Sequence, residues 1–412
     1  MVLKIPLLFC AMLLLFFPLY SQTLSENHPK EISAQIVAKG YENVTVNRRN
    51  DTLFIGLENR VWRFEPRAVA EILKVVMPAI DSNAVVAITL LHTGIPVTTV
   101  IVGRKRYESL VAGRLQATGF ADSVVAVLSD RAYRNSREYL HPVNPSFNKL
   151  DIVVIPQLKF QFGNFIHPLE LQFNVAPAVQ ISFLKGMSFT AQVIFPIYNN
   201  IIGDPEGNTI RPGVVLLSQT FRLPYQFFTT VNAGYFTRNR YGINGDVYKF
   251  LFNGKMAVHA TIGYTGQMQV LEGKFAYTNL NAFTWFCDAS WRFSKYDLTV
   301  RAGYGRFIDH DQGWRVDIGR QFGEVSIGFF AMQTGGVMNG GFNFIVPLPP
   351  RKYGTRNRIR IRPASYVPWE YRAKGLPSYG RTFSSGQGTE QLIQDMNPDF
   401  IRTQLGKQIL FH

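Results

Sequence analysis

A two-residue period in hydrophobicity runs through the second half of the chain and restricts the folds open to it. In "GWRVDIGRQFGEVSIGFFA", residues 313–331, the large apolar residues Trp314, Val316 and Ile318 alternate with polar or small ones. Such alternation is typical of β-strands, because successive side chains point to opposite faces of a sheet. About twelve segments between residues 151 and 348 share the pattern, which predicts a mainly β structure with one apolar and one polar face.

The links between these segments favour a membrane barrel over a soluble sandwich. Long links at 199–213 and 267–281 follow odd-numbered segments. Short links follow the even-numbered ones, at Leu184-Lys185-Gly186, Leu223-Pro224, Asn253-Gly254, Ser294-Lys295-Tyr296 and Gly323-Glu324. Short turns at one end and long loops at the other are typical of outer-membrane barrels, and a closed barrel leaves no unpaired strand edge in lipid. We therefore predict an antiparallel transmembrane β-barrel of about twelve strands over residues 151–348, with its apolar face toward lipid.

The first 22 residues have the pattern of a secretory signal peptide. Lys4 precedes an apolar stretch from Ile5 to Leu19, which is too short to span a bilayer. A retained signal anchor is the alternative interpretation. Cleavage would leave Cys287 as the only cysteine, so that no intramolecular disulfide could form. We expect an exported protein located in the cell outer membrane.

Residues 23–115 predict a small α/β domain before the barrel. The expected elements are a helix over 31–39, a strand hairpin that turns at 49–51, a helix over 66–80, and two strands over 84–92 and 95–102. This succession suits a small sheet with helices on one face. Residues 116–150 are interpreted as a connector, and residues 349–412 as a basic tail. With an even number of strands both ends of the barrel open on one side, so we expect the α/β domain and the tail in the periplasm.

The charge balance indicates an anionic partner. The chain has 43 Lys and Arg against 28 Asp and Glu, a formal net charge of +15. Because an exported protein does not meet cellular nucleic acid, outer-membrane lipid phosphate and acidic polysaccharide are the partners expected. The candidate contacts are seven arginines: Arg292, Arg301, Arg315, Arg356, Arg358, Arg360 and Arg362. In the alternative interpretation, those on the strands are braces that pair with Asp288 and Asp317.

The sequence contains no pattern that predicts an enzyme. Zinc-ligand spacing, a nucleophile elbow and a phosphate loop are all missing. The acidic sequence Asp309-His310-Asp311 lies in a link between strands, where Asp is an ordinary turn former. The sequence 204–207 has too few ligands for calcium, and Cys287 is on the apolar side of its strand. We therefore expect no catalytic residues, no metal and no cofactor.

Two stretches carry a resemblance to a known family. "GRFIDHDQGWRVDIGRQFGEVSIGFFAMQTGG" resembles the carboxyl-terminal part of the YjbH-like family of bacterial outer-membrane barrel proteins, which are associated with exopolysaccharide production. "GYENVTV…LFIGLENRVWRFEPRAVAEIL" resembles the small α/β domain that precedes the barrel in that family. Typical members have further barrel-like sequence upstream, so the resemblance does not imply a self-sufficient export pore.

The resemblance implies a non-enzymatic outer-membrane barrel that assists exopolysaccharide assembly or export. Periplasmic export or assembly proteins would then be its partners. The alternative is a structural or adhesion barrel whose extracellular loops bind a partner.

Overall fold

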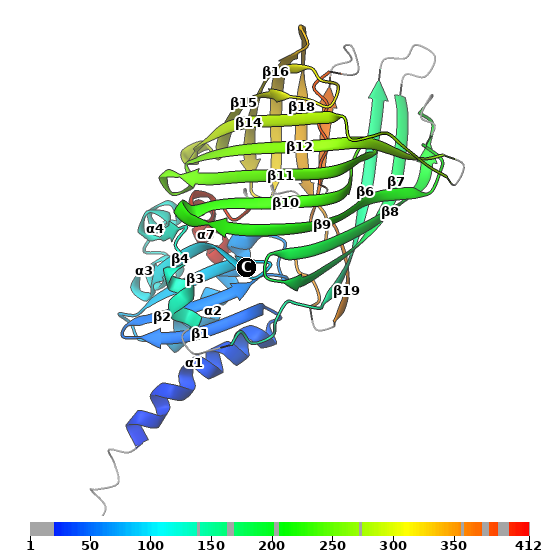
Figure 1. Cartoon of the computed structure of the whole chain (residues 1–412). Coiled ribbons are helices and arrows are strands. Elements are labelled where there is room, and N and C mark those ends of the chain that lie inside the picture. Colours follow the sequence, from blue (N-terminus) through cyan, green and yellow to red (C-terminus); the bar gives the residue numbers. More distant parts are fainter. Residues whose placement is uncertain are drawn as a thin grey trace, which may run out of the picture.

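The computed structural model contains two β-sheets with helices around the smaller one (Figure 1). It describes residues 20–137, 141–162, 169–201, 206–271, 274–355, 358–372, 379–385 and 395–411. The predicted signal peptide lies mostly outside these residues, and its cleavage stays a prediction. Within the described residues, no helix is both long and apolar enough to cross a membrane.

The smaller sheet forms the α/β domain and has the strand order β1-β2-β3-β4-β5. Its strands are β1 (Glu42–Arg49), β2 (Thr52–Glu58), β3 (Val85–His92), β4 (Ile95–Gly103) and β5 (Val125–Val127). The helices are α1 (Tyr20–Ala38), α2 (Glu65–Val76), α3 (Arg104–Val111), α4 (Ala117–Ser123) and α5 (Arg131–Arg137), and a 3-10 turn, η1 (Met77–Ala79), follows α2. Both predicted helices and both predicted hairpins are confirmed.

Local sequence explains why α2 forms where it does. Pro66 occupies the first turn, where a missing N–H costs no helical hydrogen bond, and Phe64 before it is extended. Val69, Ile72, Leu73 and Val76 then recur at helical spacing and are fully buried. The apolar face of α2 therefore belongs to the core of the α/β domain.

The α/β domain is larger than the sequence predicted. Within the expected connector, β5 pairs with β4, α5 packs on β1 and β2, and α4 packs on α3 and α7. The C-terminal helix α7 (Pro398–Leu410), in the predicted tail, packs on α2 and α4 and buries Ile401 and Leu405 completely. The prediction of a plain connector and a separate basic tail is therefore wrong. Short-range patterns do not show that a distant apolar helix completes this core.

Among the described residues, the larger sheet has fifteen strands, where the sequence predicted about twelve. The additional members are a short spur, β13, on β12 and two strands, β19 and β20, from the predicted tail. All neighbours are antiparallel except β19 and β6. The strands are β6 (Leu150–Phe162), β7 (Leu169–Leu184), β8 (Met187–Asn199), β9 (Arg211–Leu223), β10 (Phe227–Phe236), β11 (Arg240–Leu251), β12 (Met256–Leu271), β13 (Lys274–Tyr277), β14 (Ala282–Phe293), β15 (Leu298–Arg306), β16 (Gln312–Phe322), β17 (Val325–Thr334), β18 (Val337–Pro347), β19 (Ile359–Pro363) and β20 (Tyr366–Arg372).

The two ends of this sheet meet through one segment of chain. β19 pairs with β6, β20 pairs with β18, and only Ala364 and Ser365 separate β19 from β20. The Ala364 N–H donates to the Val154 carbonyl at 2.9 Å, and the Leu348 N–H donates to the Ser365 carbonyl at 3.1 Å. Backbone hydrogen bonds of Ala364 and Ser365 thus link the β6 edge of the sheet to the end of β18. In the described residues, no strand ladder joins β20 to β6, so the structure does not define a closed barrel.

The two faces of the sheet differ in polarity as the alternation predicts. On β17, Phe329 is 66% exposed, while the next residue along, Phe330, is 5% exposed. The same outward side carries a large exposed apolar residue on each of nine neighbouring strands: Leu217, Val231, Ile243, Ile262, Phe283, Tyr304, Ile318, Phe329 and Phe342. We call this side the outer face and the opposite side the inner face.

All five short links lie against the α/β domain or α7. The Gly186 N–H donates to the Thr93 carbonyl at 2.8 Å, and the Asn397 side chain donates to the Gly254 carbonyl at 2.8 Å. Arg222, directly before the Leu223-Pro224 link, donates to the Pro96 carbonyl, Ser294 donates to Asp399, and Arg63 donates to Glu324. The short-turn end of the large sheet therefore sits on the α/β domain (Figure 1).

Candidate functional site: the inner face and the domain junction

Six polar side chains form a continuous chain of contacts across the inner face, and we call them the inner polar chain. They come from β9, β10, β11, β12, β14 and β15 in that order: Ser218, Asn232, Asp246, His259, Asp288 and Arg301. The Ser218 hydroxyl donates to Asn232 Oδ1 at 2.7 Å, and Asn232 Nδ2 donates to Asp246 at 3.4 Å. This order follows from the antiparallel register, which places same-parity residues of neighbouring strands side by side.

The second half of the inner polar chain carries its charges. His259 Nδ1 lies 2.9 Å from Asp288 Oδ2, and His259 Nε2 lies 3.5 Å from Asp246 Oδ1. Arg301 Nη2 lies 2.7 Å from the same Asp288 oxygen. Asp288 is therefore the hub, because His259 and Arg301 both contact its Oδ2 atom.

Arg315 lies beyond the inner polar chain and is also paired. Its Nη2 is 2.7 Å from both Asp317 Oδ1 and Glu370 Oε2, and its guanidinium stacks over the Phe330 ring at 4.3 Å. The pairs of Arg301 with Asp288 and Arg315 with Asp317 are those of the brace interpretation. Neither arginine presents an unmatched charge to a polymer.

Arg292 anchors the C-terminal helix instead of lining an open surface. It is buried, with Nη2 2.6 Å from Asp297 and Nε 3.2 Å from Asp399. Its guanidinium also lies over the ring of Phe400, 5.1 Å from the centroid. The prediction that Arg292 contacts an anionic polymer has no support in this geometry, because α7 covers the side chain.

The arginines of the predicted tail do not form one exposed ladder. Arg356 lies outside the described residues, and Arg358 is exposed. Arg360 is buried, and Arg362 is half-buried with its guanidinium over the Tyr353 ring. Pairing of β19 with β6 explains the difference, since it turns these two side chains toward the protein interior.

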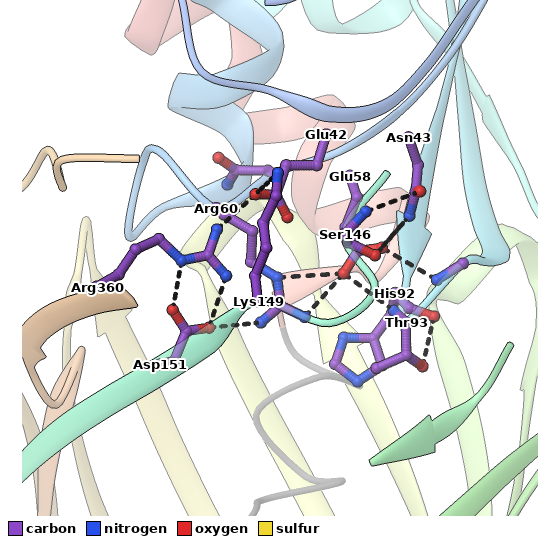
Figure 2. A network of polar contacts seen from close by, with 12 residues as sticks. Glu42, Asn43, Glu58, Arg60, His92, Thr93, Ser146, Lys149, Asp151 and Arg360 are labelled. Carbon is purple, nitrogen blue, oxygen red and sulfur yellow. Dashed lines mark hydrogen bonds and ion pairs between the residues drawn. The ribbon is translucent and has the colours of Figure 1, made fainter. Parts of the chain in front are cut away.

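Arg360 belongs to a buried charged group that we call the junction cluster: Glu42, Glu58, Arg60, Lys149, Asp151 and Arg360 (Figure 2). Arg360 Nε and Nη2 contact the two Asp151 oxygens at 2.6 and 3.0 Å, and Nη1 pairs with Glu42. Lys149 Nζ lies 2.8 Å from Glu42 Oε1. These contacts join β1 of the α/β domain to β6 and β19 of the large sheet.

Glu58 is the second carboxylate centre of the junction cluster. It accepts from Arg60 at 2.8 Å, Asn43 at 2.7 Å, and the backbone N–H groups of Thr93 and Gly94 at 3.2 and 3.0 Å. Burial opposes its ionisation, yet Arg60 and these donors hold the pKa of Glu58 below its usual value. Burial lowers the pKa of the neighbouring His92 to about 4, so His92 is neutral at pH 7.

The junction cluster leaves little room for a ligand. Its cavity has a volume of about 30 Å³, on the scale of one water molecule. Three carboxylates face three cations, all within a few contacts of one another. We interpret the junction cluster as a clamp between two folding units, not as a binding site.

Two parts of the C-terminal segment, at Phe383 and Met396, pack against the inner face, which the sequence did not predict. Phe383 packs on Phe236 with ring centroids 5.0 Å apart, and Arg238 Nε donates to the Thr382 carbonyl at 2.8 Å. Near the short turns, Met396 packs with inner-face aromatics including Tyr248. The isolated apolar residues of the tail gave no periodic signal that could have indicated this. Parts of the chain thus cover the inner face near both ends.

The acidic loop sequence Asp309-His310-Asp311 contains a residue with a structural role. Asp311 Oδ2 accepts from the Gly380 N–H at 2.7 Å. Among the described residues, no group of three or more His, Cys, Asp or Glu side chains is arranged to hold a metal; part of 204–207 lies outside them. Cys287 is exposed.

Comparison with known proteins identifies the family. The family model described as exopolysaccharide biosynthesis protein YbjH matches residues 18–212 and 206–343, most of the chain. The chain belongs to the YjbH family. The resemblance seen in the sequence is thereby confirmed, and it covers both the α/β domain and most of the large sheet.

Other comparisons add little to the family assignment. No curated protein matches this YjbH-family chain. Among solved structures, a loop L8 deletion mutant of OmpT, an outer membrane protein of Vibrio cholerae, is similar over 48% of this chain and 85% of that chain. The two are 7% identical, with a TM-score of 0.26.

Proposed function

We propose that this YjbH-family protein is a non-enzymatic outer-membrane component that assists exopolysaccharide assembly or export. The large sheet would lie in the outer membrane, with the α/β domain and α7 in the periplasm. There the α/β domain would meet export or assembly proteins. The family assignment supports the link to exopolysaccharide.

The observation that carries the membrane location is the outer face. It presents large exposed apolar side chains on nine neighbouring strands. Soluble monomers rarely expose apolar patches of more than a few hundred Å². Lipid contact accounts for such a face, and the polar inner face is then shielded from the acyl chains.

The inner face supports an assisting role more than that of an independent open pore. Arg301 and Arg315 on this face are paired with carboxylates, and Phe383 and Met396 place the C-terminal segment against it. The α/β domain lies under the short-turn end. Passage of a polymer would require these covering parts to move.

A substitution on each face tests the membrane location. Phe329→Arg should destabilise the protein by roughly 2–4 kcal/mol if the residue lies near the bilayer midplane, because a charge is costly in lipid. Ser326→Arg, on the inner-face side of the same strand, should cost much less. The measurement is the fraction of heat-resistant folded protein in isolated outer membranes. Equal tolerance of both changes would contradict the proposal.

Accessibility of single cysteines tests the orientation. In a Cys287→Ser background, Asn208→Cys, in a long loop, should react with an impermeant maleimide on intact cells. Lys105→Cys, on α3, should react only after the outer membrane is permeabilised. The reverse pattern would place the α/β domain outside the cell.

Gene deletion tests the role itself. Loss of this protein should reduce surface exopolysaccharide while other outer-membrane proteins and detergent resistance stay normal, and re-expression should restore the polymer. Unchanged polymer would refute the role in exopolysaccharide assembly or export. General envelope damage would favour a structural function instead.

A further inference from the structure

A groove lies where the large sheet meets the α/β domain, on the outer side of β19. It has a volume of about 530 Å³. One wall is the end of α1 and the residues after it, and the other is the chain that leads into β19. The lining residues are Ala38, Lys39, Gly40, Lys352, Tyr353, Gly354, Thr355, Ile359, Arg360 and Ile361.

The walls of this groove are fixed by backbone contacts. Lys352 forms a β-bridge with Trp62, and the Tyr353 N–H donates to the Val61 carbonyl at 2.7 Å. Gly40 has a φ of +97°, and a Cβ there would lie 1.9 Å from Thr355 Oγ1. Glycine at this position therefore allows the two walls to approach closely. The opposite end is held by the β19–β6 ladder.

The described residues that line the groove include Lys39, Lys352 and Arg360 and no carboxylate. Lys39 and Lys352 are exposed, and so is Arg358, which directly precedes the lining residue Ile359. None of these three cations forms an ion pair within the described part of the chain; Lys352 lies over the Trp62 ring at 5.6 Å. Arg360 is different, because Glu42 and Asp151 already neutralise it. The positive charges of Lys39, Lys352 and Arg358 thus lie beside Arg360, whose charge is already neutralised.

Apolar side chains continue from the groove onto the outer face. Ile359 and Ile361 point outward and are 58% and 74% exposed. Ile361 is level with Ile152 on β6, so this apolar strip joins the face that would contact acyl chains. A ligand that matches both parts must be anionic at one end and hydrophobic at the other.

We infer that this groove binds the headgroup of an anionic phospholipid, with its acyl chains along Ile359 and Ile361. Lys39, Lys352 and Arg358 would surround the phosphate. The inference rests on the proposed membrane location, because it places the groove at the headgroup level of the leaflet nearest the α/β domain. A phosphate-bearing headgroup near clustered Lys and Arg gains charge attraction that falls with salt.

Lipid binding to the purified full-length protein tests the groove. The protein in detergent micelles is titrated with phosphatidylglycerol or with phosphatidylcholine of the same chain lengths, and retained lipid is counted by native mass spectrometry. We expect several-fold preferential retention of phosphatidylglycerol, and its loss in the triple variant Lys39→Gln, Lys352→Gln, Arg358→Gln. The matched control, Lys105→Gln, Arg106→Gln, Arg114→Gln, removes three exposed cations from around α3 and should keep the preference.

Two further arms separate the outcomes. Millimolar inorganic phosphate should not displace the lipid, since it lacks chains for Ile359 and Ile361; full displacement by phosphate would overturn the lipid assignment. Equal retention by the groove variant and the wild type would overturn it as well. A wild-type protein that inserts into vesicles without preferring phosphatidylglycerol refutes the groove alone. A protein that stays soluble without detergent refutes the proposed membrane location.

Discussion

The junction cluster and the inner polar chain are both networks of charged side chains, but they are assembled in different ways. In the junction cluster, Arg360 contacts Asp151 and Glu42, which precede it in the sequence by 209 and 318 positions. In the inner polar chain, each contact joins neighbouring strands, as between His259 and Asp288, 29 positions apart. The first network therefore holds two folding units together, while the second only reinforces a sheet that backbone hydrogen bonds already define.

The difference implies unequal consequences of breaking each network. In the junction cluster, the side chains of Glu42 and Asp151 are 0% and 7% exposed, so loss of their shared cation leaves buried negative charge that Lys149 and Arg60 compensate only in part. On the inner face, Arg301 keeps a side chain that is 28% exposed, and water can replace part of a lost contact. Four predictions test this contrast, beginning with the largest effect.

Arg360→Gln should give the largest loss of stability, about 3–5 kcal/mol, because it leaves two buried carboxylates without their shared cation. The measurement is thermal unfolding of the detergent-solubilised protein together with limited proteolysis of the α/β domain. Arg358→Gln is the matched control, two residues away and exposed, and should change stability by less than about 0.5 kcal/mol. Equal effects of the two changes would mean that the junction cluster does not clamp the units.

Asp288→Asn should have the next largest effect, roughly 1.5–3 kcal/mol, because Asp288 accepts from both His259 and Arg301. The same unfolding assay measures it, with Ser290→Ala on the same strand as the control. Proteolysis of the α/β domain should be unaffected, unlike in Arg360→Gln. If Asp288→Asn also makes the α/β domain sensitive to proteolysis, the inner polar chain holds the two units together as the junction cluster does, and the contrast is wrong.

The double change Arg301→Gln, Arg315→Gln should cost about 1–2 kcal/mol in total, because both side chains remain partly exposed to water. Because both charges are already paired, exopolysaccharide output per folded molecule should stay constant. The measurement is surface polymer normalised to the heat-resistant folded band on a gel. A fall in output with the folded amount unchanged would show that these arginines contact an acidic polymer.

Acid should weaken the junction more than the inner face. Burial lowers the pKa of His92 to about 4 from 6.5, so the unfolded chain binds a proton between these pH values while the folded chain does not. Stability is therefore fully present above pH 6.5 and falls as the pH drops toward 4. The lowered pKa of Glu58 acts in the same direction.

Replacing the histidine isolates its share of this acid sensitivity. His92→Asn should flatten the loss of stability between pH 6.5 and pH 4, measured as the unfolding temperature across that range. The loss due to Glu58 should remain, at lower pH. If the unfolding temperature of His92→Asn falls with pH as steeply as that of the wild type between pH 6.5 and pH 4, protonation of His92 on unfolding does not cause the acid sensitivity.

Several features of the inner face could be predicted from sequence. Alternation assigned Asp288, Arg301, Arg315 and Asp317 to one side of neighbouring strands, and the structure contains the two pairs expected from that assignment. Strand pairing between neighbours in sequence makes such contacts local. The junction cluster could not be predicted, because no short-range pattern relates Arg360 to Glu42.

The sequence by itself determined the alternating strands between residues 151 and 348, their two faces, and α2 and both hairpins of the α/β domain. Each of these depends on periodicity or turn chemistry within a few residues, which local physics controls. Only the tertiary structure decided the fate of the predicted tail: β19 and β20 join the large sheet, Phe383 covers the inner face, and α7 enters the core of the α/β domain. Those placements depend on which distant surfaces remain uncovered once the rest has folded. Because the hydrophobic effect is non-directional, a local sequence pattern does not specify which surface an apolar segment will cover.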